Sequence, residues 1–239
     1  MAYHLKQGLN LFYKHLASFI LRAALLVFAK EPIPGAVKTR LTTLLTPEEA
    51  AMLYAAFLKD AWSQYQKIDA DLRLYVAPPV KPESEWIPEQ AAVFTQTGSG
   101  LGERMLMAFL ETFKAGYERI VIVGTDHPTL PDDFLEMAFE ALNERYSMVI
   151  GPSEDGGYYL LGMNEWYPEV FKLMHYSHPD VFKQTLARIE TTEASLSILP
   201  KWYDVDTPQD LVRLKSDLKD LPENVAQNTR HFVQILTKT

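Results

Sequence analysis

Short apolar runs alternate with amphipathic segments along most of this chain, and this alternation constrains the fold more than any other feature. The apolar runs have the length of strands, and the segments between them place apolar residues at helical spacing. Parallel neighbours need a crossover connection, which is usually a helix, so this order predicts an α/β fold with a mainly parallel sheet flanked by helices. We predict strands at residues 23–29, 72–76, 92–95, 119–123, 148–150, 158–161 and 195–199.

The amphipathic segments predict the helices and set the number of domains. Proline is favoured at the first position of a helix, so Pro47 is expected to begin the first of them. With 239 residues, 47% of them hydrophobic, the chain can bury one large core. No linker marks a boundary, so we expect a single domain over 23–239. We predict helices at 47–67, 101–115, 131–145, 178–189, 208–218 and 223–236.

Residues 1–22 are expected to form an N-terminal amphipathic helical extension. A helix is predicted over 3–20, because apolar residues recur there close to helical spacing: Leu5, Leu9, Phe12, Leu16 and Phe19. A membrane span is not expected, because Arg22 lies inside the longer apolar stretch and a central arginine costs about 2.5 to 3.5 kcal/mol of insertion. The helix would dock on the domain or on a second subunit, which leaves a homodimer open.

Net charge and cysteine content limit the partners. The formal net charge is −8 and no basic stripe is visible, so a nucleic acid is not expected as a partner. A small anion bound with a divalent metal remains compatible with this charge. The chain has no cysteine, which excludes disulfides, thiolate metal sites and a cysteine nucleophile. A cysteine-free chain also fits the reducing cytoplasm, which is the location we expect.

The loop after the first predicted strand gathers cations. Lys30, Lys38 and Arg40 lie around two prolines and a glycine, which restrict the path of the backbone. Because the ligands of open parallel sheets bind at the carboxyl ends of the strands, these cations are candidates for binding a diphosphate. The alternative is a solvated turn that carries incidental surface charges.

Aspartates follow two other predicted elements. Asp126 comes directly after the strand at 119–123, where one carboxylate and substrate phosphates can hold a hard divalent cation. Strand periodicity places Asp204 and Asp206 on one face, which also favours a cation. An Asp turn is the alternative for Asp126. Helix capping by Thr207 and Asp210 would explain those two residues, but it explains neither Asp204 nor Asp206.

Two glycine-containing segments complete the set of candidates. Glu154 and Asp155 offer an acid or a base beside Gly156 and Gly157, although a plain hairpin turn would also use Asp-Gly. The second segment opens the helix at 101, where free N–H groups can bind a base, a ribose or a phosphate. A glycine-rich turn alone would look the same. The candidate residues of this second segment are Gly98, Gly100, Leu101 and Arg104.

Five motifs, at 28–41, 98–105, 124–128, 151–158 and 204–208, together resemble one family. It is a group of uncharacterised bacterial glycosyltransferase-like proteins in the nucleotide-diphospho-sugar transferase superfamily, associated with radical-SAM and selenium-domain proteins or with arsenosugar biosynthesis. The resemblance spans about residues 23–220. More distantly, the chain looks like the guanylyltransferases of molybdenum-cofactor and deazaflavin-cofactor synthesis. The segment His175-Tyr176-Ser177-His178 departs from the family pattern.

The resemblance implies an A-type glycosyltransferase fold, with a Rossmann-like sheet, and a set of roles. Asp126 and Asp206 would hold Mg²⁺ or Mn²⁺, and Lys38 and Arg40 would contact the phosphates. Asp155 would lie near the acceptor and is the candidate base, with Asp126 the second catalytic residue. The remaining expected contacts are Lys30, Gly98, Gly100, Leu101 and Arg104 to the nucleotide, and Glu154, Gly156 and Gly157 to the acceptor.

Three functions stay open at this point. The preferred one is metal-dependent transfer of a sugar from a nucleotide-diphospho-sugar to a small acceptor. The second is nucleotidyl transfer from a nucleoside triphosphate, against which the loop after the first strand argues, since it holds only one glycine, Gly35. The third is a non-catalytic nucleotide-binding protein, which gives no reason to keep both Asp126 and Asp206.

Overall fold

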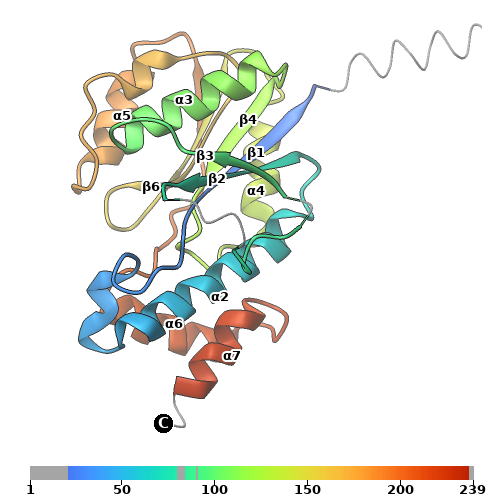
Figure 1. The fold of residues 1–239 in the computed structure, drawn as a ribbon. Helices are drawn as coiled ribbons and strands as arrows, with labels where there is room; N and C mark the ends of the chain where they lie inside the picture. The colour runs from blue at the N-terminus through green and yellow to red at the C-terminus, as the bar shows by residue number, and fades with distance from the viewer. Residues whose placement is uncertain (1–20, 80–83, 90, 237–239) are drawn as a thin grey trace, which may run out of the picture.

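The structure is a computed structural model, and it describes residues 21–79, 84–89 and 91–236. The helix predicted over 3–20, and with it most of the extension at 1–22, lies outside the described residues. One seven-stranded sheet runs through the molecule in the order β3-β2-β1-β4-β6-β5-β7 (Figure 1). The strands are β1 (Ala23–Lys30), β2 (Asp71–Ala77), β3 (Ala92–Thr95), β4 (Arg119–Val123), β5 (Ser147–Pro152), β6 (Tyr158–Met163) and β7 (Ser195–Ile198).

The predicted sheet is confirmed as mainly parallel, with one strand reversed. β1 pairs in parallel with β2 and β4, β2 with β3, and β5 with β7. β6 runs antiparallel to both of its neighbours, β4 and β5. The turn at 153–157 connects β5 directly to β6, and antiparallel strands can be joined by such a tight turn. This turn is the glycine-containing segment that the sequence singled out.

Each predicted helix has a counterpart, and two 3-10 helices, η1 (Thr39–Thr43) and η2 (Pro168–Phe171), were not predicted. Three boundaries were predicted wrongly by three or four residues: α4 ends at Ala141 rather than 145, α5 begins at Val181 rather than 178, and α7 begins at Gln227 rather than 223. Pro47 does begin the first helix, behind a capping box formed by Thr46 and Glu49. The helices are α2 (Pro47–Tyr65), α3 (Leu101–Lys114), α4 (Asp132–Ala141), α5 (Val181–Ile189), α6 (Pro208–Asp220) and α7 (Gln227–Leu236).

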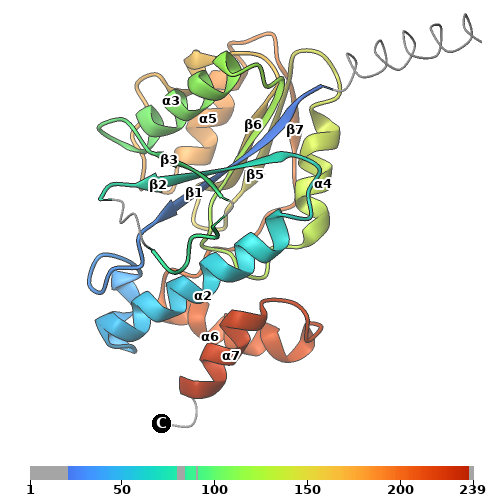
Figure 2. The ribbon, with the colours of Figure 1, turned by 45° about the vertical axis from the view of Figure 1, so that its right-hand side comes forward.

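Helices cover both faces of the sheet, so the molecule has three layers. Figures 1 and 2 show α3 and α5 above the sheet, and α2, α6 and α7 below it. Alternate residues of β1 serve the two faces: Leu25 and Val27 join the core against α2, α4, α6 and α7, while Ala24 and Leu26 join the core against α3 and α5. A strand with both faces covered reads as a continuous apolar run, which is why β1 was easy to predict.

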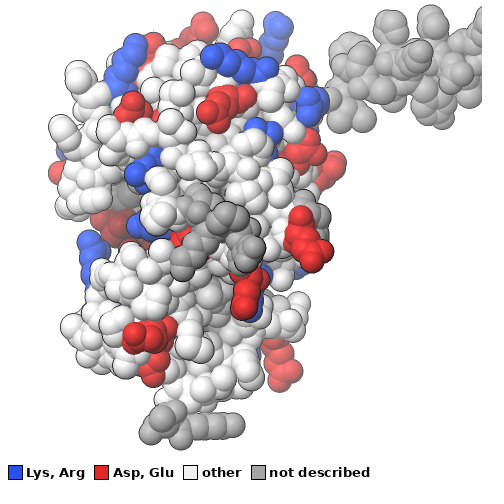
Figure 3. Space-filling model, in the orientation of Figure 1, with Lys and Arg blue, Asp and Glu red and all other residues white. Residues whose placement is uncertain are grey.

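Two further observations concern the surface charge and the apolar character of the helices. On the face drawn in Figure 3, Lys and Arg are interspersed with Asp and Glu rather than gathered in a stripe. Within the described part of the chain, no helix combines the length and the apolar character needed to cross a membrane.

Candidate functional site

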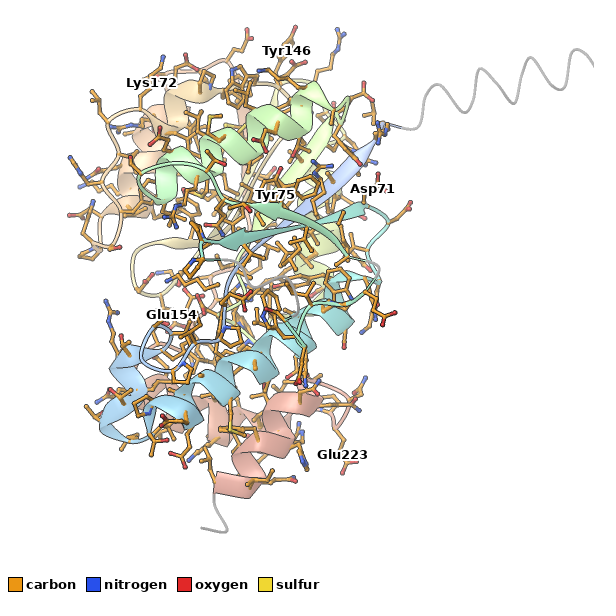
Figure 4. The ribbon with its side chains drawn as sticks, in the orientation of Figure 1. Asp71, Tyr75, Tyr146, Glu154, Lys172 and Glu223 are labelled. Atoms are coloured by element: carbon orange, nitrogen blue, oxygen red, sulfur yellow. The ribbon has the colours of Figure 1, made fainter. Side chains whose placement is uncertain are left out.

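The carboxyl ends of β1 and β4 and the loops beyond them frame a cavity of about 480 Å³. Asp71, at the start of β2, and Glu154, after the end of β5, lie on opposite sides of the molecule in Figure 4. Because Lys30 ends β1 and Asp126 follows β4, the cavity opens at the carboxyl edge of the sheet, where ligands of open α/β folds bind. The charged residues that line it are Lys30, Lys38, Arg104, Asp126, Asp155, Asp204 and Asp206.

Lys38 lies at the centre of this charged group. Its Nζ is 2.5 Å from Oδ1 of Asp126 and 2.8 Å from Oδ1 of Asp206. Only 3% of the lysine side chain is exposed, and its Nζ lies within 5.7 Å of the ring centroids of Tyr54 and Phe57. The backbone of Lys38 has φ 48° and ψ 35°, in the left-handed region that residues with a Cβ rarely adopt. The predicted cationic loop thus directs one lysine inward, between two carboxylates.

The two loops that carry the aspartates are tied together by the main chain. The Val205 amide donates to the carbonyl oxygen of Asp126 over 2.8 Å, which brings Asp206 beside the end of β4. Thr207 and Asp210 form the capping box of α6, so the capping alternative accounts for those two residues. Asp206 itself points at Lys38 instead. The structure thus brings Asp126 and Asp206 together at Lys38, while their role as metal ligands stays a prediction.

Mutual contacts set the charge states of this group. Burial lowers the pKa of Lys38, but Asp126 and Asp206 raise it by more, so this pKa lies above its ordinary value. Burial raises the pKa of the Asp126 carboxyl, but the Lys38 ammonium lowers it by more, so this pKa lies below its ordinary value. Lys38 is therefore a cation and Asp126 an anion at neutral pH.

Asp204 lines the same cavity as Asp206 but has a different environment. Its Oδ2 accepts a 2.5 Å hydrogen bond from Oγ of Ser153. Burial, together with the nearby Asp126 carboxylate, raises the pKa of Asp204 to about 7. Asp204 and Asp206 both line the cavity, although they do not lie in a strand, and the sequence pattern could not show that only Asp206 of the two pairs with Lys38.

His127, next to Asp126, is buried and does not line the cavity. Its Nε2 has no hydrogen-bond partner among the described residues, and its ring meets the edge of Tyr159 at a centroid distance of 5.6 Å. Burial lowers the pKa of His127 to about 4, although the Asp126 carboxylate opposes the shift. His127 is therefore neutral at neutral pH and packs in the core.

The second half of the cavity lies on the β5–β6 side, around Asp155. Oδ1 of Asp155 accepts a hydrogen bond from the Gly157 amide at 2.9 Å, which fixes the carboxyl at the turn. Tyr158 and Ser177 line this part of the cavity as well. Glu154 differs: its Oε2 pairs with Nη1 of Arg213 at 2.7 Å, and it is not among the cavity residues. The turn at 153–157 therefore presents one of its two carboxyl groups to the cavity.

The remaining candidates divide in the same way. Lys30, Leu101 and Arg104 line the cavity, whereas Arg40 is exposed within η1 and does not line it. Gly98 has φ +141°, and a Cβ there would overlap the Arg104 amide, so this glycine shapes the start of α3. The roles of all the candidates stay predictions. Those that do not line the cavity are Arg40, Gly98, Gly100, Glu154, Gly156 and Gly157.

Sequence reasoning missed several cavity residues. Tyr54 comes from the middle of α2, and its hydroxyl accepts from the Lys30 amide at 3.1 Å. Gln96 follows β3, and its Nε2 donates to the carbonyl oxygens of Ala29 and Tyr75. Neither belongs to a motif, and a single glutamine at the end of a short strand gives no signal of its own. Their positions follow from the packing of the sheet edge.

The donor set suits a hard divalent cation. Asp126 and Asp206 offer carboxylate oxygens, the ligands that Mg²⁺ prefers, and both reach one point, now held by the Lys38 ammonium. Among the residues that the structure describes, no three His, Asp or Glu side chains have the spacing of a metal site. Substrate phosphates and water would therefore have to supply the other ligands, as is usual for Mg²⁺.

Comparisons with known proteins agree with this fold. The family described as an uncharacterized protein conserved in bacteria (DUF2064) matches residues 60–178. The crystal structure of a "putative nucleotide-diphospho-sugar transferase" from Desulfovibrio desulfuricans G20 is 32% identical, with a TM-score of 0.82. The match covers 90% of this chain and 97% of that chain. No curated protein sequence matches the chain.

Two more distant structures show the fold alone. A cytidylyltransferase from Leptospira borgpetersenii is 13% identical, with a TM-score of 0.54, over 91% of this chain and 94% of that chain. A 4-diphosphocytidyl-2C-methyl-D-erythritol synthase is 12% identical, also with a TM-score of 0.54, over 81% of this chain and 97% of that chain. The sheet and its covering helices are thus those of nucleotide-diphospho-sugar transferases and cytidylyltransferases.

Proposed function

The chain belongs to the family of the Desulfovibrio desulfuricans protein, and from that premise we propose that it transfers a sugar from a nucleotide-diphospho-sugar to a small acceptor, with Mg²⁺ or Mn²⁺ bound. One observation carries the proposal: Lys38, Asp126 and Asp206 meet at one point of the cavity. A cation site beside further cations is the arrangement that a departing diphosphate requires.

The charged residues that line the cavity have different roles in this proposal. Asp126 and Asp206 hold the divalent ion, which neutralises charge on the leaving diphosphate when it is bound. Lys30, Lys38 and Arg104 contact phosphate or nucleotide. Asp155 takes the proton of the acceptor hydroxyl through the oxygen that the Gly157 amide does not occupy. Catalysis is then mainly electrostatic positioning.

Nucleotidyl transfer from a nucleoside triphosphate is the second candidate function. The fold it shares with a cytidylyltransferase supports it. The loop after β1 argues against it, because two prolines and the single Gly35 offer few backbone amides to wrap a triphosphate. In this alternative, the same two carboxylates would hold the metal.

One thermal-shift panel tests the proposal. We expect nucleotide sugars together with Mn²⁺ to raise the melting temperature, because a ligand at 100 times its Kd stabilises a protein by about 2.7 kcal/mol. Stabilisation by nucleoside triphosphates alone would favour the second candidate. If no nucleotide changes the melting temperature, the proposed sugar transfer is refuted. The non-catalytic alternative is then refuted as well, because it also requires nucleotide binding.

Two aspartate variants locate the metal. Asp126→Asn is expected to lose most of the Mn²⁺-dependent stabilisation by the nucleotide while it folds normally. Asp132→Asn is the matched control, because its carboxylate is 62% exposed, pairs with Lys67 and does not line the cavity. Equal nucleotide-dependent shifts in both variants would refute the metal assignment.

A further inference from the structure

The ammonium group of Lys38 lies where a metal would approach the two carboxylates. Both of its contacts use Oδ1 atoms, at 2.5 Å on Asp126 and 2.8 Å on Asp206. The lysine side chain is 3% exposed, whereas the side chains of Asp126 and Asp206 are 45% and 40% exposed. The carboxylates are therefore open to the cavity on one side and closed by Lys38 on the other.

A divalent ion that uses these carboxylates competes with that ammonium group. Mg²⁺ binds carboxylate oxygens at about 2.0 to 2.1 Å, a shorter distance than either lysine contact. Two cations that share the same pair of oxygens also repel each other strongly where water is scarce. A metal that arrives without any other ligand therefore has to displace Lys38 from its only two ion-pair partners among the described residues.

A diphosphate would give Lys38 a new partner. The lysine side chain is a compact charge on a flexible four-carbon stem, so its ammonium group can turn from a carboxylate to a phosphate without a change in the backbone. The cavity beside it already carries Lys30 and Arg104, which favour an anion there. The backbone of Lys38 is meanwhile held at the start of η1.

We propose that Lys38 is the resident counter-ion of the metal site, and that metal and diphosphate bind together by exchanging partners with it. The metal takes the two carboxylates, and the lysine moves onto the diphosphate. This inference rests on the proposed function and adds a rule to it: divalent metal alone binds weakly, and a diphosphate increases its affinity. By linkage, the metal increases the affinity for the diphosphate by the same factor.

The decisive experiment measures Mn²⁺ binding to the free protein by electron paramagnetic resonance. Lys38→Met keeps a side chain of similar length and removes the charge. We expect it to bind Mn²⁺ alone about tenfold more tightly than the wild type, within the usual range of such couplings. We also expect inorganic pyrophosphate to increase the Mn²⁺ affinity of the wild type much more than that of the variant. The Mn²⁺–pyrophosphate complex that forms in solution is subtracted from both measurements.

Lys30→Met is the matched control, because it removes one positive charge from the wall of the same cavity. We expect its Mn²⁺ affinity to rise much less than that of Lys38→Met, because Lys30 acts on the Asp126 carboxylate from a distance whereas Lys38 contacts it. An equal rise in both lysine variants would mean that the total charge of the cavity, not a shared position, decides metal affinity. That result would overturn the proposal, as would unchanged or weaker Mn²⁺ binding by Lys38→Met.

Folding of the variant is itself informative. If Lys38→Met folds only with Mn²⁺ present, the metal replaces the ammonium group, as proposed. A variant that stays unfolded with Mn²⁺ contradicts the exchange. The proposed function fails separately: wild-type protein that binds no nucleotide sugar with Mn²⁺ refutes that function, whereas wild-type protein that binds it, with no gain for Lys38→Met, refutes only the exchange.

Discussion

Two acidic sites of this molecule use the same chemical group in opposite ways. Asp60 of α2 is 8% exposed, and its carboxylate accepts from the Asn228 amide, from Nδ2 of Asn228 and from the Thr229 amide at 2.8 to 2.9 Å. Asp126 and Asp206, at the cavity, instead pair with the side-chain ammonium of Lys38 and keep nearly half of their surface exposed.

The difference lies in what the partners can do. The donors around Asp60 include main-chain amides of the first turn of α7, which have no partner inside their own helix. They cannot leave without unwinding α7, so Asp60 anchors that helix to α2. Lys38 can leave its carboxylates by rotating its side chain. A buried carboxylate whose hydrogen bonds come from main-chain amides therefore indicates a structural role. A half-exposed carboxylate that is paired with a side-chain ammonium group indicates a binding site.

Exchanging Asp for Asn at both sites should give the largest contrast in stability. Asp60→Asn turns one acceptor into a donor that faces a buried amide, and it removes a negative charge from a helix N-terminus. We expect a loss of about 3 kcal/mol of unfolding free energy, because a buried amide loses its acceptor and the helix N-terminus loses a charge. The matched variant Asp206→Asn should lose about 1 kcal/mol or less, because Asp126 still pairs with Lys38.

Urea denaturation measures both values. Equal losses of unfolding free energy in the two variants would refute the distinction between the two sites, because Asp206 would then contribute as much to stability as Asp60.

A smaller effect concerns pH, and it arises from Asp204. Its folded-state pKa is raised to about 7 from an ordinary value of 3.8, mainly by burial. Between about pH 4 and 7 the folded state therefore holds a proton that the unfolded state releases, so this contribution to stability is present at low pH and is lost as the pH rises. Asp204→Asn cannot titrate.

We expect Asp204→Asn to gain about 2 kcal/mol over the wild type between pH 4 and 7, with EDTA present. This figure is below the full value of the shift because the carboxyl opens onto the cavity. Melting temperatures across that pH range measure it, and parallel curves for the two proteins would count against a protonated Asp204.

The smallest effect is predicted for Glu154. Its ion pair with Arg213 joins side chains that are 47% and 44% exposed, and exposed pairs contribute between 0 and about 1 kcal/mol. Glu154→Gln should therefore change the unfolding free energy by less than about 1 kcal/mol. A loss as large as that of Asp60→Asn would show that exposure does not separate structural carboxylates from the others.

The sequence predicted the sheet well because buried strands are continuous apolar runs and their covering helices are amphipathic. It also predicted that Asp126, Asp206 and Lys38 lie together, because the carboxyl ends of parallel strands share one edge. The reversal of β6 could not be predicted, since an apolar run reads the same in both directions. The 3-10 helix η1 was missed because five residues, Thr39–Thr43, are too few to give a periodic pattern.

The finer geometry of the site depends on contacts that a sequence pattern does not contain. Lys38 and Arg40 are two residues apart, yet the left-handed backbone at Lys38 turns only that residue inward. Glu154 and Asp155 are neighbours, yet Arg213, far along the chain, holds the first away from the cavity. Asp60 carried no signal at all, because its partners lie in α7, at the other end of the chain.

The turn at 153–157 limits which residues can be substituted to change the ligands that the cavity binds. Gly156 has φ +91°, a Cβ there would overlap the Pro179 carbonyl, and the Phe182 amide donates to the Gly156 carbonyl at 2.8 Å. Any larger residue at Gly156 would push α5 away from the sheet. Engineering of a new substrate range should therefore begin at Leu101, which is exposed and lines the cavity, and should leave the glycine untouched.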